Sequence, residues 1–231
     1  MKPVFIVLIS FFSATILVLA FILLLVFKPI KRSKKLKARQ YSLYRDYTEK
    51  GGIVFLGDSL TEFFRIEEFF HAHNPYNRGI AADTSADVLE RLQTNVIDLK
   101  PRKVFLQIGT NDLNSIKKNR KETTVANIKT ILTKLRENLP EAEIFCISLY
   151  PVNRKAKFFS PFFVGKRKNE DIVVINSEIK SFCKQNSFLY IDVYSHLLDE
   201  KGNLDANYTF EGLHLNFEGY RKIAEILKPH L

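Results

Sequence analysis

Ser59 follows a short apolar run and has two alternative uses, as a helix cap or as a nucleophile. Ile53 to Leu56 has the composition of a strand, Gly57 permits a sharp turn, and Asp58 or Ser59 can cap a following helix. Capping is the commoner use of a serine at such a position. A serine at a strand-to-helix turn is also where some hydrolases expose a hydroxyl beside helix-terminal N–H donors. Other residues must therefore decide between the two.

Three further motifs supply the groups that acyl transfer needs. A serine attacks well at neutral pH only when a base takes its proton and a third group orients that base. His214 can be the base, and Glu211, three residues upstream, can reach its other ring nitrogen. The backbone N–H groups of Ser59 and Gly79 and the side-chain amide of Asn111 can hold the oxyanion of a tetrahedral intermediate. Together these residues predict a site for acyl transfer through Ser59.

Ser59, Gly79, Asn111 and His214 stand in the sequences GDS, NRG, GTND and EGLHLN, in that order along the chain. On these motifs the chain from about residue 52 to its end resembles the GDSL, or SGNH, hydrolase family. It looks most like the branch that contains the catalytic subunits of platelet-activating factor acetylhydrolase and bacterial lysophospholipase-like esterases. The resemblance implies a flavodoxin-like three-layer α/β/α fold, no metal, no cofactor, and hydrolysis of small, acetyl-like esters through an acyl-serine.

Two positions depart from the pattern of that family. Glu211 stands where the family usually has an aspartate, so the carboxylate is one methylene longer and the backbone or the rotamer must differ. Ala81 and Ala82 stand where close relatives often have glycines. Because alanine does not adopt positive φ freely, we expect the loop beside the oxyanion hole to differ from that of its relatives.

Apolar, β-rich runs alternate with helical patterns after residue 51. We expect strands at 53–56, 76–80, 103–108, 143–150 and 188–193. Apolar residues at helical spacing predict helices at Ser85–Leu99, Thr123–Leu139, Asp171–Gln185 and Phe217–Leu231. This alternation is typical of a five-stranded parallel sheet with helices on both faces. Ligands of such sheets lie beyond the carboxyl ends of the strands, where the GDS, NRG and GTND motifs fall.

The chain begins with a long apolar segment. Residues 3–27 contain no charged side chain, and a helix of this length slightly exceeds a hydrocarbon core of about 30 Å. A cleaved signal peptide is the alternative, but its apolar region would span only about 7–15 residues. We therefore expect a transmembrane anchor at 1–29, a basic, helical juxtamembrane stalk at 30–50 and a hydrolase domain at 51–231.

The net charge of +10 is concentrated beside this segment. Eight basic residues up to position 39 account for +8, seven of them at 28–39, and no acidic residue precedes Asp46. The remaining domain is nearly neutral, so the cluster indicates contact with a membrane surface and not with nucleic acid. The positive-inside tendency places the domain in the cytoplasm, and an export signal-anchor with the domain outside is the alternative.

The segment Phe158 to Val164, with the sequence FFSPFFV, lies in a long connection flanked by basic residues at 155, 157, 166 and 167. Its four phenylalanines suit a loop that inserts at the bilayer interface or forms the wall of an acyl pocket. The alternative is that the rings pack into the core of the domain. The sequence favours neither interpretation over the other.

Several other polar residues are expected to be structural. His71 and His73 form a pair without the cysteine or carboxylate pattern of a metal site, so we expect a solvated loop. Asp58 and Asp112 are expected to fix loops by hydrogen bonds. The cysteines at 146 and 183 are expected to be buried free thiols.

These observations predict a membrane-anchored serine esterase of a lipid or an acylated glycan. One alternative is an O-acetyltransferase that passes the acyl group to a sugar. Another is a catalytically silent domain that binds an acylated ligand, although the serine, histidine and carboxylate speak against it. The sequence does not indicate an oligomeric state.

Overall fold

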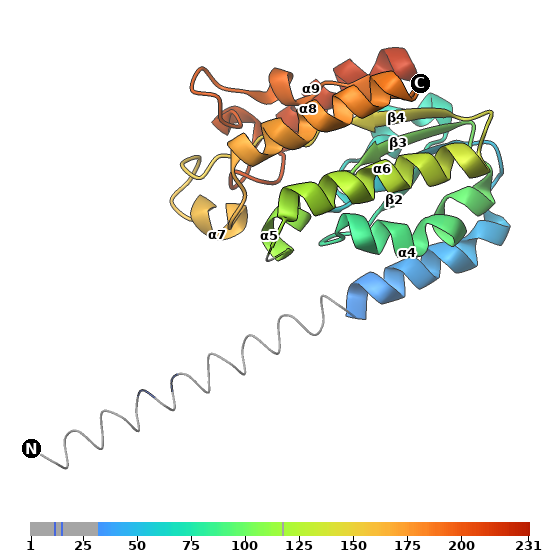
Figure 1. Cartoon of the computed structure of the whole chain (residues 1–231), viewed down its shortest axis with the longest axis horizontal. Coiled ribbons are helices and arrows are strands. Elements are labelled where there is room, and N and C mark those ends of the chain that lie inside the picture. Colours follow the sequence, from blue (N-terminus) through green and yellow to red (C-terminus); the bar gives the residue numbers. More distant parts are fainter. Residues whose placement is uncertain (1–11, 13–14, 16–31, 117) are drawn as a thin grey trace, which may run out of the picture.

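The computed structural model describes residues 12, 15, 32–116 and 118–231 (Figure 1). The predicted anchor at 3–27 lies outside the described residues except for Phe12 and Thr15. No helix formed by the described residues is long and apolar enough to cross a membrane.

A parallel sheet of five strands forms the centre of the domain. Its order is β2-β1-β3-β4-β5, which is the flavodoxin-like order, and every neighbouring pair is parallel. The predicted three-layer α/β fold with a five-stranded parallel sheet is thereby confirmed. The strands are β1 (Ile53–Gly57), β2 (Tyr76–Gly79), β3 (Lys103–Gln107), β4 (Glu143–Ile147) and β5 (Leu189–Ile191).

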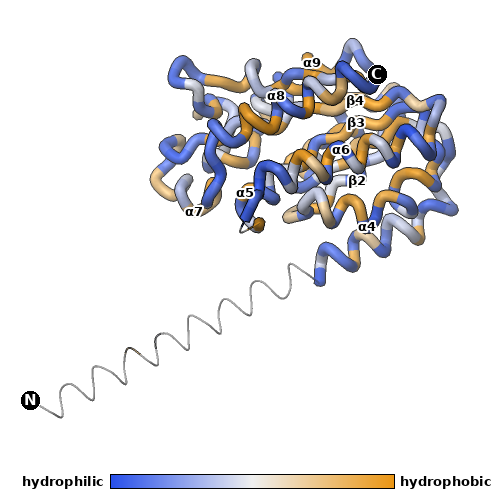
Figure 2. Tube along the Cα trace, viewed as in Figure 1, coloured by the Kyte–Doolittle hydropathy of each residue, from blue (hydrophilic) through white to orange (hydrophobic). Residues whose placement is uncertain are grey.

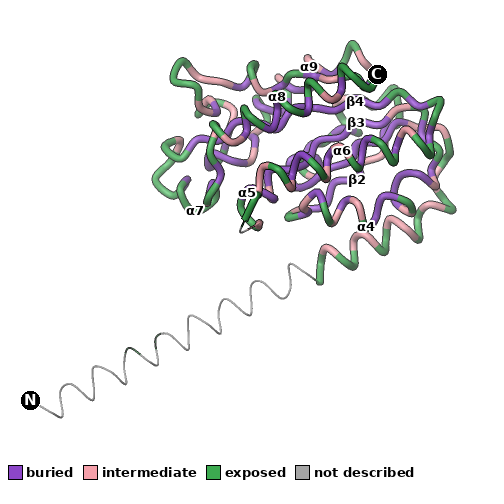
Figure 3. The backbone as a smooth tube through the Cα atoms, in the orientation of Figure 1, coloured by how far each residue is buried: buried purple, intermediate pink, exposed green. Residues whose placement is uncertain are grey.

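Alternation along each strand divides the core into two layers. Leu56 and Leu106 pack on one face with residues of α4 (Ser85–Asn95), α6 (Arg120–Asn138) and α8 (Asn169–Gln185). Phe55 and Phe105 pack on the other face with residues of α9 (Phe217–Leu227). Figure 2 shows the apolar residues concentrated in the sheet, and Figure 3 shows that the same strands are buried.

Short helices fill the connections at the carboxyl ends of the strands and elsewhere on the domain. They are α2 (Ser59–Glu62), α3 (Ile66–Phe69), α5 (Asp112–Ser115), α7 (Ser160–Val164) and the 3-10 helices η1 (Arg45–Tyr47), η2 (His71–His73), η3 (Ile97–Leu99), η4 (Tyr194–Leu197), η5 (Ala206–Tyr208) and η6 (Lys228–His230).

The ends of two predicted helices differ from the structure. The helix predicted over 85–99 divides into α4 and η3, after which Lys100 turns the chain with φ of 47° ahead of Pro101. The helix predicted over 217–231 ends at Leu227, and the last turn around Pro229 is the 3-10 helix η6. A proline lacks the N–H that an α-helical turn needs, which is why α9 stops there.

The predicted stalk is helical over residues 32–44, and this helix lies against α4 (Figure 1). Ser42 donates a hydrogen bond to Thr94 Oγ1 at 2.8 Å, and Asn95 Nδ2 donates to the carbonyl of Ala38 at 3.1 Å. Arg45 forms an ion pair with Asp98 at 2.9 Å at the far end. These contacts hold helix 32–44 on the surface of the domain along its length.

Candidate active site

The parallel register brings the predicted motifs to one edge of the sheet. Gly57 at the end of β1 pairs with Gly79 at the end of β2 and with Gln107 at the end of β3. The GDS motif starts at the end of β1, and the GTND motif follows β3 closely. His214 reaches the same edge from the loop that precedes α9. We call this edge of the domain the catalytic edge.

Asp58, and not Ser59, caps the helix that follows β1. Asp58 Oδ1 accepts a hydrogen bond from the Leu60 N–H at 2.9 Å, so Ser59 is the first residue inside α2. The Ser59 hydroxyl is consequently not needed as a cap. Its Oγ lies 3.0 Å from Nε2 of His214, which is 155 positions away in the sequence.

Glu211 lies on the other side of the His214 ring. Its Oε1 contacts His214 Nδ1 and also accepts the His214 backbone N–H at 3.2 Å. Thr209 Oγ1 donates to the carbonyl of His214 at 2.7 Å and accepts the Gly212 N–H at 2.8 Å, which closes the loop around the carboxylate. Glu211 is 5% exposed, and its Oε2 has no hydrogen-bond partner among the described residues. The longer side chain therefore reaches the histidine at the expense of one unpaired oxygen.

The Asn111 side-chain amide is held from both ends. Its Nδ2 donates to the carbonyl of Asp83 at 3.0 Å and lies 3.4 Å from Asp58 Oδ2. Its Oδ1 accepts a hydrogen bond from Arg167 at 2.7 Å, which fixes the orientation of the amide. Arg167 is buried and also donates to the carbonyl of Thr110 at 2.8 Å. The guanidinium thus aligns the segment that carries Asn111.

The other two predicted oxyanion donors have different surroundings. Within the described part of the chain, no acceptor contacts the Ser59 N–H. The Gly79 N–H donates to Asn77 Oδ1 at 2.9 Å, so a role for Gly79 as an oxyanion donor requires exchange of that bond. A Cβ at Gly79 would lie 2.2 Å from the Glu62 nitrogen, so the close approach of β2 to α2 itself requires glycine.

Loop 80–83 contains an alanine in a left-handed conformation. Ala82 has φ of 65°, which we expected alanine to avoid and which costs a non-glycine residue roughly 1–2 kcal/mol. Its carbonyl accepts a hydrogen bond from Lys34 at 3.0 Å, and the neighbouring Ala81 N–H donates to Glu62 Oε2 at 2.5 Å. Side chains from helix 32–44 and from α2 therefore hold the strained loop in place.

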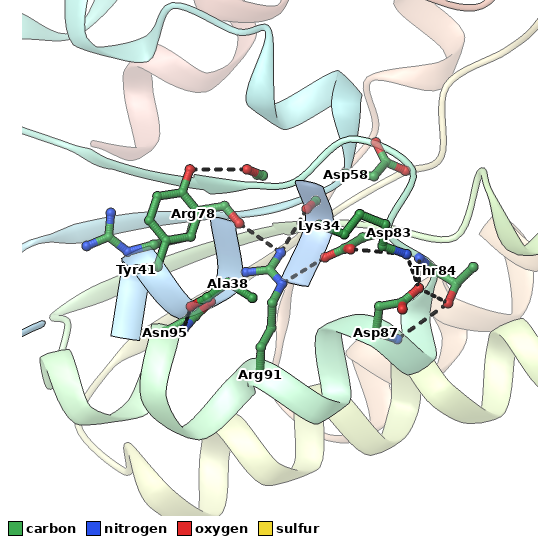
Figure 4. A network of polar contacts seen from close by, with 12 residues as sticks. Lys34, Ala38, Tyr41, Asp58, Arg78, Asp83, Thr84, Asp87, Arg91 and Asn95 are labelled. Atoms are coloured by element: carbon green, nitrogen blue, oxygen red, sulfur yellow. Dashed lines mark hydrogen bonds and ion pairs between the residues drawn. The ribbon is translucent and has the colours of Figure 1, made fainter. Parts of the chain in front are cut away.

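Asp83 is the centre of a buried polar network (Figure 4). Arg91 on α4 pairs with it at 2.8 Å and also donates to the carbonyls of Gly57 and Arg78 at 3.1 and 2.9 Å. Lys34 Nζ lies 3.4 Å from the other carboxylate oxygen of Asp83, Oδ1. Burial raises the pKa of Asp83, and the charges of Arg91 and Lys34 oppose that rise. The arginine thereby connects loop 80–83 to the ends of β1 and β2.

Helix 32–44 contacts two more residues of the catalytic edge. Lys37 pairs with Glu62 at 2.5 Å, and the Tyr41 hydroxyl donates to the Gly79 carbonyl at 3.2 Å. No local sequence pattern marks Lys34, Arg91 or Arg167, because their partners are distant in the chain. In the sequence, Lys34 belongs only to the basic cluster at 28–39, and that cluster by itself indicates contact with a membrane surface.

Two buried aspartates fix loops, as predicted. Asp112 accepts the Ser85 N–H at 2.9 Å and contacts the Ser85 hydroxyl, which joins α5 to the start of α4. Asp58 is 1% exposed, and burial raises its pKa to about 7 against the opposing effects of the Leu60 N–H, Arg167 and His214. A neutral and a charged form of this side chain therefore both occur near neutral pH.

An apolar pocket of about 740 Å³ opens beside His214. The ring of Phe63 lies 5.4 Å from the His214 ring, at an interplanar angle of 55°. Glu211 and His214 line the pocket, whereas Ser59, Gly79 and Asn111 do not. The remaining apolar lining consists of Phe63, Phe69, Phe159, Phe163, Phe210, Leu215, Phe217 and Tyr220.

The phenylalanines of the FFSPFFV segment are exposed. Phe158 and Phe162 are 101% and 84% exposed, and only Ser160 and Val164 of α7 are buried. The interpretation that these rings pack into the core is therefore wrong. Phe159 and Phe163 form part of the pocket wall.

The remaining candidates lie away from this edge. The histidines at 71 and 73 are exposed in η2, and the cysteines at 146 and 183 are buried and unpaired. In the part of the chain that the structure describes, no three histidine, cysteine or carboxylate side chains are arranged to hold a metal ion.

A sequence model of the GDSL-like lipase/acylhydrolase family matches residues 55–222. The chain belongs to this family. A GDSL-like acylhydrolase is an ester hydrolase, which confirms the predicted enzyme class. The match spans the motifs that carry Ser59, Gly79, Asn111, Glu211 and His214.

Two curated relatives of this GDSL-like acylhydrolase differ in length. The platelet-activating factor acetylhydrolase IB subunit beta homolog of Drosophila melanogaster is 27% identical over 200 residues, covering 82% of this chain and 83% of that protein. The N-acylneuraminate cytidylyltransferase of Escherichia coli O18:K1:H7 is 28% identical over 189 residues, which are 79% of this chain. The alignment spans only 42% of the length of the E. coli protein.

Solved structures share the fold of this GDSL-like acylhydrolase. A structure from Streptococcus pneumonia, described as a platelet activating factor, superposes with a TM-score of 0.83 at 26% identity, covering 91% of this chain and 98% of the other. A GDSL-like lipase from Bacteroides thetaiotaomicron superposes with a TM-score of 0.74 at 24% identity, covering 84% and 96%. The second similarity concerns the fold alone.

Proposed function

We propose that the chain is a membrane-anchored serine esterase that works through an acyl-serine intermediate. The observation that carries the proposal is the line of three groups in which Ser59 Oγ lies 3.0 Å from His214 Nε2 and Glu211 contacts His214 Nδ1. This arrangement has the nucleophile, the base and the group that orients the base in hydrogen-bonding reach.

The first half of the reaction forms the acyl-enzyme. His214 Nε2 takes the proton of Ser59 as its Oγ attacks the ester carbonyl, and Glu211 stabilises the imidazolium that results. The Ser59 N–H holds the oxyanion. The Asn111 amide joins it once its bond to Asp58 or Asp83 is exchanged, and the Gly79 N–H once its bond to Asn77 is exchanged. His214 then returns the proton to the leaving alcohol as the carbon–oxygen bond breaks.

The second half releases the acid. His214 takes a proton from water as the water attacks the acyl-serine carbonyl, and the same donors hold the second oxyanion. Collapse of this intermediate breaks the bond to Ser59 Oγ, which regains its proton from His214. The enzyme returns to its starting state without a cofactor, because every proton in the cycle passes through one imidazole.

The apolar pocket is proposed to receive the alcohol part of the substrate. The leaving oxygen must lie beside His214, which protonates it, and the pocket is lined by His214 but not by the Ser59, Gly79 and Asn111 side of the site. Its aromatic lining suits a lipid-like alcohol better than a glycan. A small, acetyl-like acyl group would then lie on the opposite side, near Asn111.

The apolar segment at 3–27 is proposed to anchor the enzyme, with the basic cluster at 28–39 on the anionic side of the bilayer and the domain in the cytoplasm. The support for the anchor is the uncharged length of the segment, and the support for its orientation is the excess of basic residues that follow it.

Ester hydrolysis by the full chain in detergent tests the chemistry. Two series of esters are compared, acetates of alcohols of increasing length and p-nitrophenyl esters of acids of increasing length. We expect kcat/KM to rise along the first series and to fall along the second. Ser59→Ala should lower kcat by at least about 10⁴-fold, whereas Ser181→Ala, on the exposed surface of α8, should leave it unchanged.

Labelling by a fluorophosphonate separates the proposal from its alternatives. The wild-type chain should label at Ser59. A folded chain that neither turns over esters nor labels would instead be a binding domain, and a chain that labels but passes acetate to an added sugar faster than to water would be an acetyltransferase.

A further inference from the structure

Seven exposed phenylalanines lie at or near the pocket, and five of them line it. The most exposed are Phe158, just before α7, at 101% and Phe162, in α7, at 84%. Phe217 and Phe210 follow at 65% and 64%. The ring centroids of Phe162 and Phe163 lie 5.4 Å apart and those of Phe159 and Phe163 lie 6.0 Å apart, so these three rings contact one another. We call this surface the aromatic edge; its members are Phe63, Phe158, Phe159, Phe162, Phe163, Phe210 and Phe217.

The backbone beneath the rings is well anchored. Val164 and Ser160 are fully buried, and Arg167 donates to the carbonyls of Phe163 and Val164 at 3.2 and 3.1 Å. The connection that carries Phe158, Phe159, Phe162 and Phe163 is therefore a fixed turn, and Figure 3 shows exposed residues around α7. Apolar rings held outward in this way are typical of a surface that meets an apolar partner.

In the connection that carries the rings of Phe158 to Phe163, every charged side chain is positive. Residues 154–168 contain no aspartate or glutamate. Five of their basic side chains are exposed, and the sixth, Arg167, is buried. Aromatic rings flanked by lysines and arginines suit the interfacial region of a bilayer with anionic head groups. The exposed members are Arg154, Lys155, Lys157, Lys166 and Lys168.

Helix 32–44 starts at the end of the domain where the catalytic edge and α7 lie. Lys34, in its first turn, contacts Ala82 at the catalytic edge, whereas Arg45 contacts Asp98 at the opposite end of the sheet. Figure 1 shows α5 and α7 at the end of the domain from which this helix starts. Any chain of five residue steps, such as that from position 27 to position 32, can span at most about 18 Å. An anchor at 3–27 would therefore hold the catalytic edge close to the bilayer.

We propose that the aromatic edge docks on the surface of an anionic lipid bilayer, so that the pocket beside His214 opens toward the lipid. The two observations that carry this are independent, because the basic residues and the most exposed rings belong to the connection between β4 and α8, whereas the entry point belongs to the N-terminal helix. The docking does not depend on the proposed acyl-serine chemistry. In this orientation a lipid-like ester reaches Ser59 from the membrane without crossing water.

Tryptophan fluorescence tests the docking in the full chain, because the chain contains no tryptophan. Phe162→Trp places a single probe on α7. Tyr47→Trp places a matched probe in η1. Tyr47 is 90% exposed, and η1 lies just before the start of β1, at the opposite edge of the sheet. Both variants are reconstituted in vesicles of phosphatidylcholine and phosphatidylglycerol, with and without brominated acyl chains.

The expected result is a blue-shifted emission for Phe162→Trp and several-fold stronger quenching by the brominated lipid than for Tyr47→Trp. Equal quenching of the two probes, or none at either, overturns the proposal. A blue shift at position 162 that grows with the protein-to-lipid ratio and is not quenched by bromine would mean that a second copy of the chain covers the rings, and it too overturns the proposal.

Two further arms test the basis of the docking. Replacing Lys155, Lys157 and Lys166 together by glutamine should reduce the quenching of Phe162→Trp in anionic vesicles toward its value in neutral ones, and an unchanged signal contradicts the proposed role of charge. Ser59→Ala in the Phe162→Trp background should leave the quenching unchanged. Loss of activity with intact quenching thus separates a failure of the chemistry from a failure of the docking.

Discussion

Loop 80–83 and the aromatic edge both border the catalytic groups, yet they are held by different kinds of interaction. Loop 80–83 is held by charged side chains from helix 32–44, α2 and α4, namely Lys34, Glu62 and the buried Arg91. The aromatic edge exposes its rings and touches the pocket mainly through apolar surface. Donors that stabilise a developing oxyanion must be fixed before the reaction, whereas apolar binding is non-directional and tolerates movement. We therefore expect changes in loop 80–83 to affect the rate and changes in the aromatic edge to affect substrate preference.

Removing Arg91, which pairs with the buried Asp83 of loop 80–83, should have the largest effect on stability. Arg91→Met leaves Asp83 without its close partner in a buried site, and we expect the free energy of unfolding to fall by about 3–5 kcal/mol. Arg221→Met is the matched control, because Arg221 is also a helical arginine paired with carboxylates but is exposed, and its loss should leave the free energy of unfolding nearly unchanged. Urea denaturation measures both, and equal losses would contradict the distinction.

Asp58 should make the stability of the folded domain depend on pH. Its pKa is about 7 in the folded chain and lies near 3.9 in the unfolded chain, so the folded state holds a proton that the unfolded state has lost. Asp58 therefore contributes fully to the free energy of unfolding below about pH 4. This contribution, up to about 4 kcal/mol, is lost as the pH rises to 7. Asp58→Asn, which retains a capping side chain, should therefore gain stability relative to wild type between pH 4 and pH 7.5. Parallel unfolding curves for the two proteins over this range would refute the assignment.

Removing an oxyanion donor should affect rate more than binding. Asn111→Ala is expected to lower kcat by about 10²–10³-fold with little change in KM, because the amide acts on the charge that develops in the transition state. Asn138→Ala, at an exposed position on α6, serves as the control and should leave both constants unchanged. A rise in KM at constant kcat would place Asn111 in substrate binding instead.

Loosening loop 80–83 from helix 32–44 should have a smaller effect of the same kind. Lys34→Met removes the hydrogen bond to Ala82 and the ion pairs with Asp83 and Asp87, and we expect up to about a tenfold fall in kcat with KM unchanged. Lys35→Met, one position along on the exposed side of the helix, should have no effect. Equal kinetics for the two variants would show that the helix does not influence the loop.

Substitutions in the aromatic edge should have the smallest effect on stability and should act on KM. Phe159→Ala and Phe163→Ala remove half-exposed rings, so the free energy of unfolding should change by no more than about 0.5 kcal/mol. We expect KM to rise a few-fold for acetates of long alcohols and to stay constant for methyl acetate, since only the longer alcohol reaches these rings. A change in kcat that is the same for all alcohols would remove the contrast between the two regions.

The comparison also shows where sequence reasoning succeeded. Strands such as 53–56 and 103–108 were predicted nearly to their ends, because a buried parallel strand is a continuous apolar run. The residues proposed for the site stand in short motifs that follow successive strands, and the parallel sheet brings these strand ends together. Ala82 was misjudged because its backbone conformation is maintained by Lys34 and by neighbouring hydrogen bonds, and local propensity contains no information about them.

The order of the motifs, the period of the apolar residues and the resemblance that they carry determined the fold class, the family and the residues proposed for the chemistry. Only the tertiary structure decided that Asp58 is the cap and leaves Ser59 free for His214, that Lys34, Arg91 and Arg167 brace the catalytic edge, and that the FFSPFFV rings face outward. The reason is physical: secondary structure and motifs are written in neighbouring residues, whereas ion pairs, burial and exposure depend on which distant segments meet when the chain folds.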